Sequence, residues 1–209
     1  MLHAFPLGPE MWAPQRDALE GHDVLTPNLY DLDGSSIDGW AEQIWDGFDD
    51  DFVAVGLSMG GYVALALARL AGDRARGLFL AGARVGADDA DRQAARNAAI
   101  ETLRERGIDA WAPSAPAPPA PERTVEELIR ATEALRDRRD STDFVRDYER
   151  PLWVVVGSED PFLPEAEARD IVASAPNARL EVLEGAGHFT NVERRNRFNE
   201  LLTEFLASV

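Results

Sequence analysis

Short apolar runs alternate with segments of helical periodicity along most of the chain. The runs combine Val, Leu and aromatic side chains and are bounded by Gly, Pro or charged residues, as β-strands are. Strands are expected over residues 1–4 (the end of a strand), 23–26, 52–57, 76–81, 151–157 and 178–183. Helices are expected between them, over residues 10–20, 36–48, 62–68, 165–173 and 192–207. This alternation predicts a parallel sheet covered by helices on both faces.

The pattern changes over residues 84–150. A polar, Ala-rich helix is expected over residues 88–106. Residues 112–121 are rich in proline, which lacks an N–H donor, so they predict an extended connector. Thr124 and Glu127 have the spacing of a capping box that starts a second helix. One domain is therefore expected, with a helical lid inserted into a core: the core is residues 1–83 and 151–209, and the lid is residues 84–150.

The apolar run at residues 52–57 ends in a Gly-x-Ser-x-Gly turn centred on Ser58 and passes directly into a helical pattern. Such a turn holds its serine in a strained conformation at the end of a buried strand. The glycines lack the Cβ atoms that would collide where strand and helix approach each other. The first N–H groups of the helix point into the same space. Ser58 is therefore predicted to be a nucleophile.

A serine hydroxyl needs a general base, and the base needs an orienting acid. His188 lies in a glycine-rich loop after the last predicted strand, so it is the predicted base. His3 is expected to bond the backbone of its own loop, and His22 to lie in a surface turn. Asp160 follows the preceding strand and directly precedes a proline, which makes it the predicted acid. Its neighbour Glu159 is the competing acid.

An oxyanion is stabilised by two backbone donors. The N–H of Met59, directly after the nucleophile, is predicted to be one of them. The loop at residues 2–8 is the expected source of the second, through the N–H of Phe5. Apolar side chains usually line a substrate pocket, and four aromatic residues are candidates beneath the lid: Trp111, Phe144, Tyr148 and Phe162.

Composition limits the other classes of function. The chain has 209 residues and a formal net charge of −17, which disfavours nucleic acid and anionic lipid as partners. It has no Cys and no Lys, which excludes disulfides, a Cys nucleophile, Ser–Lys pairs and Schiff bases. Three scattered His give no ligand set for a metal, and no cofactor is expected. With no apolar run of membrane-spanning length and no signal peptide, a cytoplasmic protein is expected.

Four segments resemble the α/β-hydrolase fold in their order: Leu-His-Ala-Phe-Pro-Leu, Gly-Leu-Ser-Met-Gly-Gly, Gly-Ser-Glu-Asp-Pro and Gly-Ala-Gly-His-Phe. Within that fold the chain is similar to small bacterial esterases, enol-lactone hydrolases and cofactor-free haloperoxidases. The resemblance implies an α/β architecture, with a mostly parallel sheet flanked by helices; with the short N-terminus described below, about six strands are expected. It also implies Ser58 as nucleophile, His188 as base and Asp160 as orienting acid, with the amides of Phe5 and Met59 as oxyanion donors.

Two departures from the family pattern matter. The family usually has His-Gly where this chain has His3-Ala4, which is expected to alter the loop backbone slightly. The family's first two strands, and most of a third, usually precede the position of His3, whereas only Met1 and Leu2 precede it here. The first strand is therefore expected to be a stub beside a poorly paired edge. Such an edge predicts reduced stability or self-association into a homo-oligomer.

The predicted function is hydrolysis of a small carboxylic ester or lactone through an acyl-enzyme on Ser58. Cleavage of a carbon–carbon bond and perhydrolysis, as in the haloperoxidases, are alternatives because the same triad serves both. A haloalkane dehalogenase is disfavoured, since that chemistry needs a carboxylate at position 58. A non-catalytic ligand-binding protein on a hydrolase fold is the alternative from another class, because fold alone does not fix function.

Overall fold

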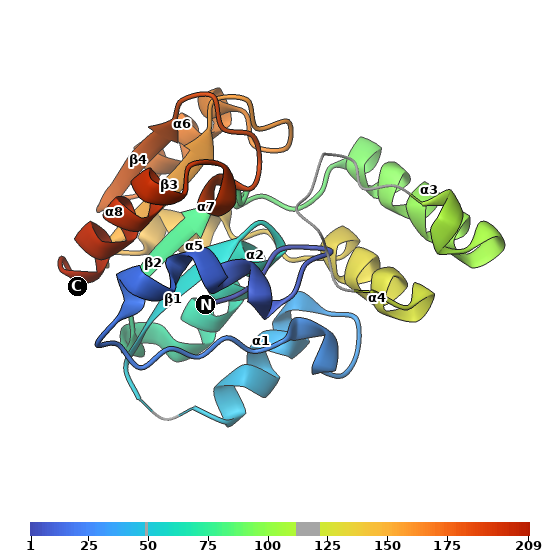
Figure 1. Cartoon of the computed structure of the whole chain (residues 1–209), viewed down its shortest axis with the longest axis horizontal. Helices are drawn as coiled ribbons and strands as arrows, with labels where there is room; N and C mark the ends of the chain where they lie inside the picture. The colour runs from blue at the N-terminus through green and yellow to red at the C-terminus, as the bar shows by residue number, and fades with distance from the viewer. Residues whose placement is uncertain (49, 112–121) are drawn as a thin grey trace.

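The computed structural model describes residues 1–48, 50–111 and 122–209. Its centre is a parallel sheet whose strands lie side by side in chain order (Figure 1): β1 (Phe52–Leu57), β2 (Ala75–Ala81), β3 (Leu152–Gly157) and β4 (Ala178–Leu183). The four runs predicted beyond residue 50 are thus confirmed to within one residue. Because parallel strands end at the same edge of a sheet, the loops that follow β1, β3 and β4 meet there.

The N-terminal part of the sheet differs from the prediction. Leu2 forms a single parallel bridge with Gly56, its N–H donating to Val55 O at 2.8 Å and its O accepting from Leu57 N at 3.2 Å. This bridge is the expected stub. Residues 23–26 form no strand, because one bridging residue beside β1 offers them no ladder to extend. The sheet within the described residues therefore has four strands and not about six.

Helices cover both faces of the sheet (Figure 1). One face carries α1 (Ile37–Asp46), α2 (Met59–Ala71), α5 (Thr142–Asp147) and α6 (Glu165–Ser174). The other carries η1 (Pro9–Leu19), α7 (Thr190–Glu193) and α8 (Arg195–Leu206). Strands between two such layers are buried on both sides, which explains their nearly continuous apolar runs. The segment predicted as a helix over residues 10–20 is a 3-10 helix, and Pro14 inside it cannot supply an α-helical N–H.

The segment predicted to be a lid, called the lid below, contains α3 (Ala90–Arg106), η4 (Ile108–Ala110) and α4 (Val125–Arg136). These helices stand to one side of the sheet and its covering helices (Figure 1). α3 and α4 pack on each other around a small apolar cluster of Ile100, Leu103, Leu128 and Ile129. The predicted capping box of Thr124 is present at the start of α4. The connector predicted over residues 112–121 lies outside the described residues.

The described residues also form two further 3-10 turns, η2 (Leu29–Asp31) and η3 (Gly72–Arg74). α5 falls in the segment predicted as lid, yet it packs against α6 on the face of the sheet.

Among the helices that the structure describes, none combines the length and the apolar character needed to cross a bilayer.

Candidate active site

Ser58 occupies the turn between β1 and α2 with φ 52° and ψ −115°, the one positive φ outside glycine in the described residues. A Cβ atom at Gly56 would lie 2.3 Å from Gly60 O, and one at Gly60 would lie 2.0 Å from Leu2 O. Both positions therefore need glycine for the strand, the helix and the N-terminal stub to approach. The N–H of Ser58 donates to Ala81 O at 2.8 Å. These contacts hold the serine in the strained geometry typical of this motif.

His188 and Asp160 face each other across the loops that follow β4 and β3. His188 Nδ1 lies 2.8 Å from Asp160 Oδ2 and 3.0 Å from Oδ1, and the two side chains are 5% and 0% exposed. Asp160 Oδ1 also accepts from the backbone N–H groups of Phe162 at 2.8 Å and Leu163 at 3.2 Å. These turn bonds fix the carboxylate, which in turn fixes the proton on Nδ1 and leaves Nε2 as the basic nitrogen.

The competing residues lie elsewhere. The side chain of Glu159 is exposed, so Asp160 is the carboxylate beside the imidazole. His22 is exposed in a turn. His3 is fully buried, and its Nε2 accepts from Leu29 N at 2.9 Å. Burial lowers the pKa of His3 to about 4, which keeps the ring neutral at pH 7. His3 therefore supports the backbone of the N-terminal loop.

The two predicted oxyanion donors come from the start of α2 and from the N-terminal loop. Met59 begins α2, and Phe5 lines the same pocket as Ser58. Neither N–H donates a hydrogen bond to another described residue. Both amides are therefore available to an oxygen atom bound above Ser58.

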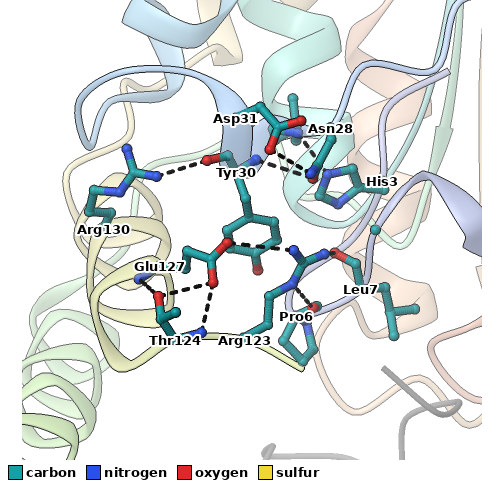
Figure 2. Close-up of polar contacts among 12 residues, drawn as sticks. His3, Pro6, Leu7, Asn28, Tyr30, Asp31, Arg123, Thr124, Glu127 and Arg130 are labelled. Carbon is teal, nitrogen blue, oxygen red and sulfur yellow. Dashed lines mark hydrogen bonds and ion pairs between the residues drawn. The ribbon is translucent and has the colours of Figure 1, made fainter. Parts of the chain in front are cut away.

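The loop that carries Phe5 is held from the lid by Arg123 (Figure 2). Arg123 donates from Nε to Pro6 O at 3.2 Å and from Nη2 to Leu7 O at 2.9 Å, and its side chain is 8% exposed. Its guanidinium carbon lies 3.8 Å from the centroid of the Tyr30 ring. His3 stacks on that ring at 5.5 Å. The loop is thus supported by His3 from the core and by Arg123 from the lid.

Arg130 makes a second connection between lid and core. From α4 it donates to Tyr30 O at 2.9 Å, to Leu32 O at 2.9 Å and to Gly34 O at 3.3 Å. The contact with Tyr30 appears in Figure 2, one side chain away from Arg123. Because all three acceptors belong to residues 30–34, Arg130 anchors α4 without a hydrogen bond to the loop of Phe5.

A pocket of about 250 Å³ lies between the strand ends and the lid, and both Ser58 and His188 line it. Trp111 and Phe162 also line it, as predicted from their aromatic character. Phe144 and Tyr148 do not, which corrects that prediction. Both lie at α5 and pack into the main core, where Tyr148 Oη donates to Ala75 O at 3.0 Å. Their helix belongs to the covering layer of the sheet and not to the lid.

Sequence reasoning missed the polar side chains on the lid side of the pocket. Arg92 and Arg96 line it from α3, together with Asp88 before that helix and Arg84 after β2. Arg92 and Arg96 are spaced by four residues, and this spacing places them on one face of α3. That periodicity was the available signal. In the part of the chain that the structure describes, no group of three or more His, Cys, Asp or Glu side chains is arranged to hold a metal ion.

Comparison with known proteins decides the family. The model of the alpha/beta hydrolase family matches residues 1–201. The chain belongs to the alpha/beta hydrolase family. This membership confirms both the fold class and the resemblance derived from the four sequence motifs. It also agrees with the parallel sheet flanked by helices, and with a sheet that begins in a stub.

Solved structures show the same fold over nearly the whole hydrolase chain. A thermophilic esterase from Thermogutta terrifontis, determined with malate bound, is 26% identical with a TM-score of 0.85, over 99% of this chain and 88% of that one. The enol-lactonase from Burkholderia xenovorans LB400 is 20% identical with a TM-score of 0.78, over 99% of this chain and 90% of that one.

A relative found by sequence matches a shorter part of the chain. A proline iminopeptidase from Lactobacillus delbrueckii subsp. lactis is 33% identical over 67 residues, which are 32% of this chain and 22% of that protein.

Proposed function

We propose that this hydrolase cleaves small carboxylic esters or lactones through an acyl-enzyme on Ser58. The observation that carries the proposal is the buried His188–Asp160 pair, whose imidazole lines the same pocket as the strained Ser58. A binding protein gains nothing from a strained serine beside an oriented base, because strain of this kind persists only where the surrounding structure maintains it.

The chemistry follows from the geometry. Ser58 Oγ attacks the substrate carbonyl carbon while His188 Nε2 takes the hydroxyl proton. Asp160 keeps the imidazole in the required tautomer and stabilises the imidazolium that forms. The N–H groups of Phe5 and Met59 stabilise the oxyanion. His188 then protonates the leaving alcohol oxygen, and water releases the acyl group by the same steps. Ser58 Oγ makes no hydrogen bond to His188 among the described residues, and catalytic contacts of this kind often shorten only when substrate is bound.

Relatives favour ester cleavage among the reactions this triad supports. The esterase is 26% identical to this chain, which supports an argument about activity. The enol-lactonase is 20% identical, which supports an argument about the fold alone. Its structure holds malate, a small dicarboxylate. The iminopeptidase matches too small a part of its own length to transfer its activity. Carbon–carbon bond cleavage and perhydrolysis are the second candidates, because the same nucleophile and base serve them.

A fluorophosphonate probe and a panel of nitrophenyl esters and lactones test the proposal. Wild type is expected to be labelled at Ser58 and to turn over short-chain esters. Ser58→Ala is expected to lose labelling and to lower kcat by about 10⁴-fold or more. Ser208→Ala, at the exposed C-terminus, is the matched control and retains full activity. Ester cleavage that persists in Ser58→Ala would refute the nucleophile, and an unlabelled wild type would favour a binding protein.

A further inference from the structure

The lid side of the active-site pocket is basic, although the chain as a whole has a formal net charge of −17. Among the described residues that line the pocket are three arginines, Arg84, Arg92 and Arg96, and a single carboxylate, that of Asp88, apart from the catalytic groups. An arginine in a pocket can attract an anionic ligand only if a carboxylate of the protein does not already neutralise its charge. The carboxylate partner of each arginine therefore has to be identified.

Two of the three arginines have a carboxylate of their own. Arg84 pairs with Glu167 at 2.5 Å and donates to Phe162 O at 3.1 Å. Arg92 pairs with Asp89, the residue that caps α3. Each pair is close to neutral, so neither leaves a full positive charge for a ligand.

Arg96 differs because it shares its carboxylate with another arginine. Asp88 Oδ1 lies 2.6 Å from Arg138 Nη1, and Asp88 Oδ2 accepts from Arg96 Nε at 3.3 Å. The side chains of Arg138 and Asp88 are 2% and 1% exposed. Two guanidinium groups therefore share the one buried carboxylate of Asp88. The exposed carboxylate of Asp140 also interacts with Arg138, so the positive charge that is left over is that of Arg96.

Of the two guanidinium groups, that of Arg96 is the one that can bind a ligand in the pocket. Both terminal nitrogens of Arg138 donate to backbone carbonyls, Leu135 O and Gly86 O, at 2.9 Å each. Arg96 is anchored through Nε alone, and its two terminal nitrogens donate to no other described residue. Its side chain is 32% exposed and lines the pocket that contains Ser58. Such an anchored guanidinium presents two coplanar N–H donors, which match the two oxygens of a carboxylate.

We propose that Arg96 binds a carboxylate of the substrate, so that the preferred substrates are small esters or lactones with a second, ionised carboxyl group. The inference rests on the proposed function and names the substrate class of the same site. A carboxylate fits better than a phosphate ester, because one surplus positive charge balances one negative charge. The remaining lining, which includes Phe5, Trp111 and Leu135, suits the short apolar chain between the two ends of such a substrate.

A pair of esters of equal length tests this proposal: the 4-nitrophenyl monoester of glutaric acid and 4-nitrophenyl pentanoate. Wild type is expected to hydrolyse the glutarate ester with a kcat/KM about tenfold higher than that for the pentanoate ester. Arg96→Gln is expected to lower kcat/KM for the glutarate ester about tenfold or more, since a hydrogen bond between charged groups contributes about that factor. Hydrolysis of the pentanoate ester should change less than about twofold.

Two further variants separate recognition from folding. Arg106→Gln removes an exposed arginine from the last turn of the same helix, and the hydrolysis of both esters should be unaffected. Among the described residues, the side chain of Arg106 donates to Thr102 Oγ1 alone. Arg96→Lys retains the charge without the planar donor pair and should recover part of the preference for the glutarate ester. Equal losses on both esters in Arg96→Gln would indicate a structural role and overturn the proposal. A wild type that does not prefer the glutarate ester would also overturn it.

The experiments distinguish an error in the hydrolase proposal from an error in the proposal that Arg96 binds a carboxylate. If neither ester is cleaved and Ser58 is not labelled, the hydrolase proposal is wrong. Binding of a carboxylate at Arg96 is then tested by calorimetric titration of the whole chain with glutarate. Binding that Arg96→Gln weakens about tenfold would support the site. Binding that is absent, or that the substitution leaves unchanged, would overturn it.

Discussion

The core side and the lid side of the pocket are built in different ways. On the core side, Ser58, His188 and Asp160 follow the ends of three strands of one continuous ladder, and backbone hydrogen bonds fix their loops. On the lid side, Arg96 stands on a helix whose own apolar cluster is small, and the lid is tied to the N-terminal part of the core by two arginines, Arg123 and Arg130.

This difference assigns different tasks to the two sides. Bond breaking requires atoms placed within a fraction of an ångström, and strand ends in a packed sheet provide that precision. Selection of a substrate tolerates looser placement, because a charged contact acts over several ångströms. Substitutions on the core side should therefore lower kcat. Substitutions on the lid side should change which substrate is preferred, except where the lid supports the loop of Phe5.

After Ser58→Ala, the largest effect is expected at the acid of the core side. Asp160→Asn should lower kcat by about 10³- to 10⁴-fold with little change in KM, because an amide favours the wrong tautomer of His188. Steady-state kinetics on a short ester measure the effect. Glu159→Gln changes the adjacent, exposed carboxylate and is the control. Equal losses in the two variants would show that the charge of the loop, and not the contact at 2.8 Å, supports the base.

Most of the core side could be predicted from the sequence because its signals are local. The turn at Ser58 and the strand ends before Asp160 and His188 lie within short motifs, and the parallel sheet brings these ends together. Strand prediction failed over residues 23–26 for a non-local reason. Val24 and Leu25 give an apolar pattern, yet a strand also needs a neighbour, and these side chains remain 38% and 60% exposed.

The lid side could not be predicted in the same way, because its contacts join distant positions. The charge of Arg96 is not fully neutralised, because Arg138 pairs with the same carboxylate, that of Asp88. Arg138 is 42 positions away from Arg96 in the sequence and contacts Asp88 only in the folded chain. Aromatic residues were equally ambiguous: Trp111 faces the pocket, whereas Phe144 enters the core. An apolar side chain in a helical insertion has no local signal that separates these two outcomes.

The second prediction concerns the core-side support of the Phe5 loop. His3 has a pKa near 4 in the folded chain against an ordinary value of 6.5, so the unfolded chain binds more protons between these values. His3 therefore lowers the free energy of unfolding as the pH falls from about 6.5 to about 4. Between pH 7.5 and pH 5, wild type should lose about 2 kcal/mol more stability than His3→Gln.

Urea unfolding at both pH values measures this difference, and titration of the carboxylates largely cancels because both chains contain them. His22→Gln, at an exposed position, should follow the wild-type pH dependence. Parallel curves for wild type and His3→Gln would contradict a buried, neutral imidazole at position 3.

An effect on kcat smaller than that at Asp160 is expected at Arg123, the lid-side support of the same loop. Arg123→Ala removes the donors to Pro6 O and Leu7 O, which lets the Phe5 amide move away from the oxyanion. It should lower kcat about 10-fold to 100-fold and leave KM nearly unchanged, as expected for a contact that matters mainly in the transition state. Arg123→Lys should restore part of kcat. A rise in KM with unchanged kcat would instead place Arg123 in substrate binding.

The smallest effect on catalysis is expected at Arg130, and it separates anchoring of the lid from positioning of the loop. Arg130→Ala removes three hydrogen bonds to backbone carbonyls of residues 30–34, none of which belongs to the Phe5 loop. The free energy of unfolding should fall by about 1–3 kcal/mol, while kcat on a short neutral ester should change less than about twofold. Urea unfolding and steady-state kinetics on the same preparation measure both quantities. If Arg130→Ala lowered kcat as strongly as Arg123→Ala, the lid and the oxyanion loop would form one mechanical unit, and the separation of tasks between the two sides would be wrong.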